Sequence, residues 1–325
     1  MREIMTVTGA VTEDMLGAVL MHEHFLFGFC GFQGDCTLGP FQERSYMDTC
    51  IAAVNRAKAY GIHTFVDATT NECGRNPMFL KRLSEKTGVN ILCSTGYYYE
   101  SESAFSYWRF RSNFVDIDEE IFQMMQTEVT EGIGETGIRA GVIKVASSQN
   151  ISPMEERFFC AAAKVSQAFG TPIITHTQMG QQGPRQAELL VGLGAEPHHI
   201  AIGHMCGNTD VAYHEQVLRL GVFDAFDRFG LEGELFHTPT DETRADLLTE
   251  LIDRGWEDQL LISHDSVNVE LGRWRPPHPS MKNAHIGNIG ERVIPMLEER
   301  GVTKLQLRKL LIDNPARLLG GLSKK

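Results

Sequence analysis

The chain has 325 residues, of which 42% are hydrophobic and 22% are charged. These proportions are those of an ordinary globular protein with enough apolar material for a large core. The formal net charge of −12 disfavours nucleic acid and anionic membrane surfaces as partners, because their phosphates would be repelled. There is no run of about 18 apolar residues, and Met1-Arg2-Glu3-Ile4 lacks the layout of a signal peptide. We therefore expect a cytoplasmic protein without a membrane span.

Short apolar or β-branched runs bounded by turn residues recur along the chain, and this pattern predicts strands. The expected strands are, in chain order, residues 17–22, 63–67, 90–95, 141–146, 172–176, 199–204, 222–226 and 259–264. Most of them are separated by segments in which apolar residues recur at helical spacing. These expected helices are residues 48–60, 77–87, 118–132, 153–169, 186–193, 213–220 and 243–254, followed by 290–301 and 304–312.

Strands that alternate with helices imply a parallel sheet with right-handed crossovers. Eight such units in one chain of this length predict an α/β fold, the (β/α)8 TIM barrel, with an open doubly wound sheet as the alternative. No linker divides the chain, so we expect a single domain over residues 1–325. Residues 1–16 would be a short N-terminal lead-in, and residues 266–288 would form a substrate loop after the eighth strand.

The first expected strand ends in His22-Glu23-His24. Because side chains alternate across a strand, the two histidines leave from the same face and can hold one metal ion. Glu23 then faces away from both of them. Taken alone, a His-x-His pair is a weak signal, since this spacing arises by chance in many proteins.

Other expected strands carry polar residues at or near their C-terminal ends, where barrel active sites lie. They are Lys144 on the fourth strand, His176 on the fifth, His204 on the sixth and Asp265 directly after the eighth. Each would be costly to bury without a partner, so their common location predicts a metal centre. Imidazole and carboxylate ligands suit zinc, with iron, cobalt or manganese as alternatives. His264 precedes Asp265 and is expected to point away from the site.

Lys144 has two interpretations from its residue type alone. An ammonium group beside divalent ions would be repelled, so an unmodified lysine is a poor ligand. If CO2 carboxylated its amine, the side chain would become an anionic oxygen donor able to bridge two metal ions. The other interpretation is a buried lysine paired with a carboxylate.

The ordered set His22-x-His24, Lys144, His176, His204 and Asp265 resembles the ligands of the phosphotriesterase family of the amidohydrolase superfamily. Further similar motifs cover nearly the whole chain, at residues 67–70, 74–77, 87–91, 95–98, 141–144, 292–295 and 314–317. The resemblance implies two divalent metal ions bridged by N6-carboxylysine at position 144. The more buried ion would be held by His22, His24 and Asp265, and the more exposed one by His176 and His204.

The resemblance also implies a mechanism and an assembly. A hydroxide shared by the two metals would attack a carbonyl carbon or phosphorus, and Asp265 would accept the proton from the bridging water. The family further suggests a homodimer.

Two motifs resemble the lactonase branch of this family. The first is Asp227-Arg228-Phe229-Gly230-Leu231 after the seventh strand, since dedicated organophosphate hydrolases lack this arginine. Arg228 is expected to orient a substrate oxygen, with a surface ion pair as the alternative. The second is Tyr97-Tyr98-Tyr99 after the third strand. Tyr97 and Tyr98 are both expected in the substrate pocket, and Tyr98 is preferred over Tyr97 as the substrate contact.

The loop expected at 266–288 departs from the family patterns and contains Arg273, Trp274 and Arg275. Trp274 is expected to line a pocket for an acyl chain, whereas the two arginines favour an anionic substrate such as a sugar-phosphate lactone. The main hypothesis is a lactonase with promiscuous phosphotriesterase activity, acting on a small-molecule lactone or ester. The alternatives are a carboxylesterase or phosphoesterase with the same centre, and a non-catalytic binding protein, which the complete ligand set disfavours.

Overall fold

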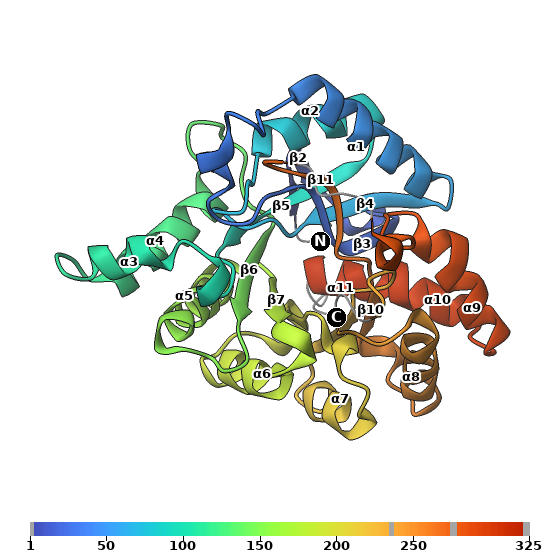
Figure 1. Cartoon of the computed structure of the whole chain (residues 1–325). Coiled ribbons are helices and arrows are strands. Elements are labelled where there is room, and N and C mark those ends of the chain that lie inside the picture. The colour runs from blue at the N-terminus through green and yellow to red at the C-terminus, as the bar shows by residue number, and fades with distance from the viewer. Residues whose placement is uncertain (1–2, 234–236, 274–277, 321–325) are drawn as a thin grey trace.

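The computed structural model describes residues 3–233, 237–273 and 278–320. Its main sheet is parallel throughout, has the strand order β10-β9-β8-β7-β6-β5-β4-β3-β11, and curls into a barrel surrounded by helices (Figure 1). The strands are β3 (Ala18–Phe27), β4 (Ile62–Asp67), β5 (Asn90–Gly96), β6 (Val142–Ser147), β7 (Ile173–Thr177), β8 (Ile200–Ile202), β9 (Phe223–Phe226), β10 (Leu260–Ile262) and β11 (Ser266–Glu270). The predicted (β/α)8 barrel is confirmed.

The eighth position of the barrel is shared by β10 and β11. β10 pairs with β9, and after residues 263–265 the same stretch of chain pairs as β11 with β3. At this seam the amide of Asp265 donates to the carbonyl oxygen of His22 over 3.0 Å. The first five residues of the expected loop at 266–288 are thus a strand that closes the barrel beside His22 and His24.

The helices of the outer ring agree with the expected segments to within a few residues, apart from the last one, which was not expected. They are α1 (Glu43–Lys58), α2 (Pro77–Thr87), α4 (Ile117–Thr130), α5 (Pro153–Phe169), α6 (Gly183–Gly192), α7 (Val211–Leu218), α8 (Asp241–Asp253), α9 (Ile294–Glu299), α10 (Lys304–Arg308) and α11 (Asn314–Gly320). The antiparallel hairpin of β1 (Ile4–Thr6) and β2 (Gly9–Val11) was not expected either, nor was helix α3 (Phe105–Arg111), which projects from the body of the barrel (Figure 1).

Two apolar clusters build the core. The larger lies between the strands and the surrounding helices, and it includes Phe65, Phe159 and Leu248. The smaller contains side chains from nearly every barrel strand together with Leu318 of α11, so α11 covers the N-terminal end of the barrel. The polar side chains singled out above lie at the opposite end, where the strands finish.

Candidate metal centre

The C-terminal ends of the strands open into a cavity of about 350 Å³. Seven of the residues that line it are among the predicted site residues: His22, His24, Tyr98, Lys144, His176, Arg228 and Asp265. The strand alternation that predicted His22 and His24 on one face is therefore correct. The cavity is also lined by apolar and aromatic side chains, which include Phe27, Tyr98, Leu231 and Val267.

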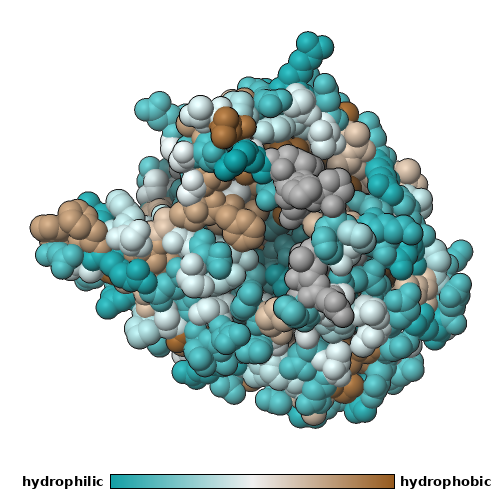
Figure 2. Space-filling model, viewed as in Figure 1, coloured by the Kyte–Doolittle hydropathy of each residue, from teal (hydrophilic) through white to brown (hydrophobic). Residues whose placement is uncertain are grey.

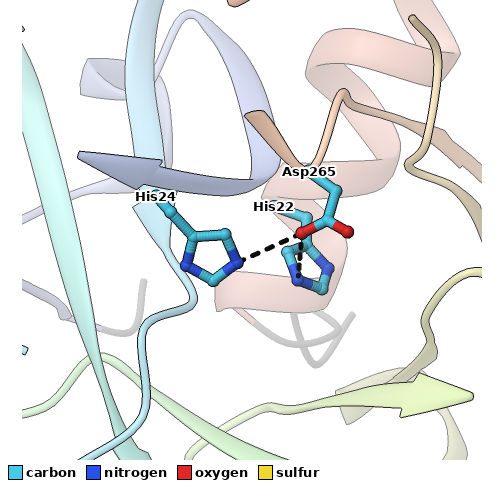
Figure 3. Close-up of side chains that lie close together, drawn as sticks. All are labelled: His22, His24 and Asp265. Carbon is cyan, nitrogen blue, oxygen red and sulfur yellow. Dashed lines mark hydrogen bonds and ion pairs between the residues drawn. The ribbon is translucent and has the colours of Figure 1, made fainter. Parts of the chain in front are cut away.

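His22, His24 and Asp265 converge on one point from β3 and from the turn between β10 and β11 (Figure 3). Asp265 Oδ1 lies 3.1 Å from His24 Nε2 and 3.6 Å from His22 Nε2. The other ring nitrogen of His24, Nδ1, is 2.7 Å from the hydroxyl of Thr69, which fixes the orientation of this imidazole. The three side chains form one of two described groups whose ligand atoms lie close enough together to hold a metal ion.

The second such group consists of His22, His204 and Asp227, and here hydrogen bonds already explain the contacts. Asp227 Oδ2 accepts from His22 Nδ1 and Asp227 Oδ1 from His204 Nδ1, each over 2.8 Å. The backbone amide of His204 also donates to Asp227 over 2.7 Å. One buried carboxylate thus keeps the proton of both imidazoles on Nδ1, so that each Nε2 has a lone pair for a metal ion. Metal-bound histidines usually donate their other ring N–H to a carboxylate in this way.

His204 supplies a direct test of whether the residues fit a metal. Its Nε2 is buried without a hydrogen-bond partner among the described residues, and Asp265 Oδ2 is 3.6 Å away. An unpaired buried imidazole nitrogen is costly, so this atom fits the role of a metal ligand. His204 and Asp265 also hold left-handed backbone conformations, with φ of 60° and 55°. Such strain in non-glycine residues is concentrated at functional sites.

His176 lies beside His204, with ring centroids 4.5 Å apart and planes nearly perpendicular. Its Nε2 is 3.0 Å from the amide oxygen of Gln178, so Nδ1 is the nitrogen left for a ligand. Burial lowers the pKa of both imidazoles well below its ordinary value, and the positive charge of Arg228 adds to this effect. Both rings are therefore neutral near pH 7, the form that binds metals.

Lys144 is only 1% exposed and reaches into the same cluster. Its Nζ lies 3.0 Å from His22 Nε2 and donates to the carbonyl oxygen of Thr175 over 2.9 Å. Burial lowers its pKa to about 8, although Asp227 and Asp265 act in the opposite direction. A sizeable fraction of this amine is consequently neutral at physiological pH, so it can act as a nucleophile.

Arg228 forms an ion pair, but a buried one inside the site rather than at the surface. Its Nε donates to Asp265 Oδ2 over 3.1 Å, and its side chain is 14% exposed. Burial raises the pKa of the Asp265 carboxyl, yet His204, His24, His22 and Arg228 together outweigh burial and hold that pKa well below its ordinary value. Asp265 is thus an ionised acceptor at the centre of the cluster.

The three consecutive tyrosines, residues 97–99, have different surroundings. Tyr98 and Tyr99 line the cavity and contact the ring of His176, with centroids 4.9 and 5.1 Å away. Burial raises the pKa of Tyr98 well above its ordinary value, so its phenol keeps its proton and can donate a hydrogen bond. Tyr97 instead packs against Phe105, Trp108 and Phe158. The structure does not bring Tyr97 to the cavity, because the chain turns at the end of β5.

Of the residues predicted in the loop, Arg273 does not join the site, whereas Trp274 and Arg275 lie outside the described residues. Arg273 is 65% exposed and its Nε donates to Asp35 over 2.6 Å. Sequence reasoning assigned no role to Asp227, although it directly follows β9 and so occupies a strand end like the other site residues. Gln178 carried no comparable signal.

An eight-position parallel barrel with imidazole, carboxylate and lysine side chains converging at its C-terminal end defines a metal-dependent barrel protein. The model of the phosphotriesterase family matches residues 2–319, and the chain belongs to this family. Among the described residues, no helix has the length and apolar character needed to cross a membrane.

Solved structures and curated proteins agree with this assignment. The chain is similar to an organophosphorus hydrolase from Deinococcus radiodurans, with 52% identity, 98% of this chain and 97% of that chain covered, and a TM-score of 0.96. It is equally similar to a multiply substituted phosphotriesterase-like lactonase from the same organism, with 53% identity, 98% and 100% coverage, and a TM-score of 0.94. A phosphotriesterase homology protein of Mycobacterium tuberculosis is 31% identical over 323 residues, 98% of each chain.

Proposed function

We propose that the protein is a metal-dependent lactonase that also hydrolyses phosphotriesters. The convergence of three histidines, His22, His24 and His204, on Asp265 is the observation that carries the proposal, together with the unpaired Nε2 of His204. Arg228 beside Asp265 favours the lactonase branch, as the sequence motif does. The similarity to proteins described as a phosphotriesterase-like lactonase and an organophosphorus hydrolase supports the same two activities.

The residues fit two divalent ions. His22, His24 and Asp265 would hold the more buried ion, His176 and His204 the other, and Lys144 would bridge them. Zinc suits this ligand set, as do iron, cobalt and manganese. When bound, the ions supply a hydroxide nucleophile at neutral pH and polarise the carbonyl or phosphoryl oxygen of the substrate.

Bridging requires Lys144 to be carboxylated. The neutral amine attacks the carbon of CO2, a C–N bond forms, and one proton is released, so that the product is the N6-carboxylysine anion. The lowered pKa of Lys144 supports this step, because only the unprotonated amine has the required electron pair. An anion at this point also replaces the ammonium that would repel metal ions.

The surrounding side chains then divide the remaining tasks. Asp265 is ionised and can take a proton from the attacking water through a carboxylate oxygen. Arg228 and the phenol of Tyr98 are donors that can orient the substrate oxygens. The apolar side chains of Phe27, Leu231 and other lining residues provide the surface for an acyl chain.

The substrate class is tested by comparing rates on one metal-loaded preparation. Acyl-homoserine lactones, simple γ- and δ-lactones, a sugar-phosphate lactone, an acyclic carboxylic ester and an aryl phosphotriester are assayed together. The proposal predicts higher kcat/KM for a lactone than for the phosphotriester and measurable turnover of both. Activity confined to phosphotriesters or to acyclic esters would contradict the lactonase assignment.

Replacing Arg228 with alanine is expected to lower kcat/KM for lactones by about 100-fold, the scale for loss of one preorganised donor. The metal content should fall less than when a ligand is replaced, because Arg228 contacts the ligand Asp265 but is not itself a ligand. Arg219→Ala is a suitable control, since Arg219 lies beyond the end of α7, is exposed, and pairs with Glu215. Lactone kinetics together with metal analysis check this, and unchanged kinetics for R228A would contradict the role.

We also infer a homodimer and a cytoplasmic location, which remain predictions from the family resemblance and the composition. Figure 2 shows hydrophobic side chains at the projecting end of the molecule that carries α3. Phe110 and Phe114 there are 66% and 71% exposed, and an apolar surface of this kind suits an interface between two copies. Size-exclusion chromatography with light scattering of wild type and F110S/F114S tests the dimer.

A further inference from the structure

We propose that Glu23 is a positioning residue for Asp265, so that the middle of His22-Glu23-His24 serves the metal centre as much as the two histidines do. Glu23 is fully buried and faces away from the cavity that its neighbours line. The inference rests on the proposed function only in taking Asp265 as a metal ligand.

The carboxylate of Glu23 holds the chain on both sides of Asp265. Its Oε1 accepts from the Ser263 hydroxyl (2.8 Å), the His264 amide (3.1 Å) and His264 Nδ1 (2.7 Å). Its Oε2 accepts from the Ser266 amide over 3.1 Å and from the Ser266 hydroxyl. Five donors therefore meet one carboxylate, and all of them belong to residues next to Asp265 or one position further away.

Asp265 needs such support because its backbone is strained. Its φ of 55° lies in the left-handed region, which L-residues adopt only when their surroundings determine the conformation. This conformation turns the Asp265 side chain towards His22 and His24, while its amide bonds the carbonyl oxygen of His22. Glu23 lies between these two histidines on β3. The tripeptide His22-Glu23-His24 therefore supplies two ligands and, through Glu23, orients the third ligand, Asp265.

His264 connects the carboxylate of Glu23 to the helical turn that begins at Ile289. Because its Nδ1 donates to Glu23, its Nε2 is the acceptor, and it accepts from the Ile289 amide over 2.8 Å. Ile289 begins the π-helical turn Ile289–Val293 that precedes α9. Glu23 thus fixes the turn that contains Asp265 between β3 on one side and the helical segment that begins at Ile289 on the other.

Glu23→Gln is the informative substitution because it keeps size and removes acceptor capacity. An amide oxygen can replace Oε1, but the amide NH2 then faces the Ser266 amide, and two donors oppose each other. The backbone at Asp265 is expected to relax. We expect kcat for hydrolysis to fall by about 10- to 100-fold and metal to be lost faster to a chelator, the usual scale for contacts behind metal ligands. KM should change by less than about threefold.

Glu155→Gln is the matched control. Glu155 is equally buried, and its carboxylate accepts from the amides of Glu100, Ser148 and Ser152, away from Asp265. If Glu23 had only a structural role, both E23Q and E155Q would lose thermal stability, and both would keep their kcat and their metal content. If E23Q does not fold, Ser266→Ala removes one donor from the same carboxylate and should give a smaller loss of the same kind.

A crystal structure of E23Q separates this inference from the proposed function. A shift of Asp265 away from its left-handed φ and from His24, absent in E155Q, supports positioning even if the wild-type protein proves inactive. An Asp265 that keeps its conformation and its distance to His24 overturns the inference, whatever the protein hydrolyses. Wild-type protein without metal or hydrolysis would overturn the proposed function alone.

Discussion

Lys144→Ala is expected to abolish nearly all hydrolysis and to leave the protein without its full complement of metal. Lys144 is buried beside His22, and alanine at this position removes the amine whose carboxylation would supply the bridging oxygen atoms. We expect kcat to fall by more than about 100-fold, which exceeds the usual effect of replacing a residue that only hydrogen-bonds to a metal ligand. Metal analysis and lactone assays on the same preparation measure both effects.

The control for this variant is Lys164→Ala, since Lys164 is an exposed lysine on α5. Reconstitution of the wild-type apoprotein with metal should be faster when bicarbonate is added, because CO2 is consumed at Lys144. K144A should show no such dependence. A K144A protein that binds two metal ions and retains its rate would contradict the bridging role.

Asp227→Asn is expected to have the second largest effect, a loss of about 10- to 100-fold in metal affinity or kcat. The carboxylate accepts from Nδ1 of both His22 and His204. An asparagine has one acceptor oxygen, and its amide NH2 would face the other ring as a second donor. One imidazole would then have to change tautomer, which protonates its Nε2 and removes a ligand.

Asp224→Asn provides the comparison for this prediction. Asp224 lies on β9, the strand that Asp227 follows, is fully buried, and is 2.6 Å from Nδ1 of His214 on α7. Its substitution disrupts an equivalent bond away from the cavity and should lower thermal stability without loss of metal. Equal metal loss in both variants, or retention of metal in D227N, would contradict the tautomer argument.

Hydrophobic patterning predicted the barrel well, because each strand is a short apolar run between turn signals. Hydrophobic patterning did not predict the elements that lack a continuous apolar run or a clear helical period. β11 (Ser266–Glu270) alternates polar and apolar residues and is a strand because it closes the ring against β3. Helix α3 consists of only seven residues, and its exposed aromatic side chains give no clear periodicity.

The site was predictable where strand geometry alone determines side-chain direction. Alternation correctly placed His22 and His24 on one face and Glu23 on the other. It could not show that Glu23 collects five donors, since these come from residues about 240 positions away. Strand alternation does not apply beyond a strand end, and the turn after β5 determines that Tyr98 lines the cavity while Tyr97 packs against Phe105, Trp108 and Phe158.

The most direct test measures lactone hydrolysis as a function of the metal bound per chain, during reconstitution of the apoprotein with zinc, cobalt or manganese. The account predicts no activity in the apoprotein and a rate that rises to saturation at two ions per chain. Full activity in metal-free protein, or no lactone hydrolysis with both sites filled, would contradict it.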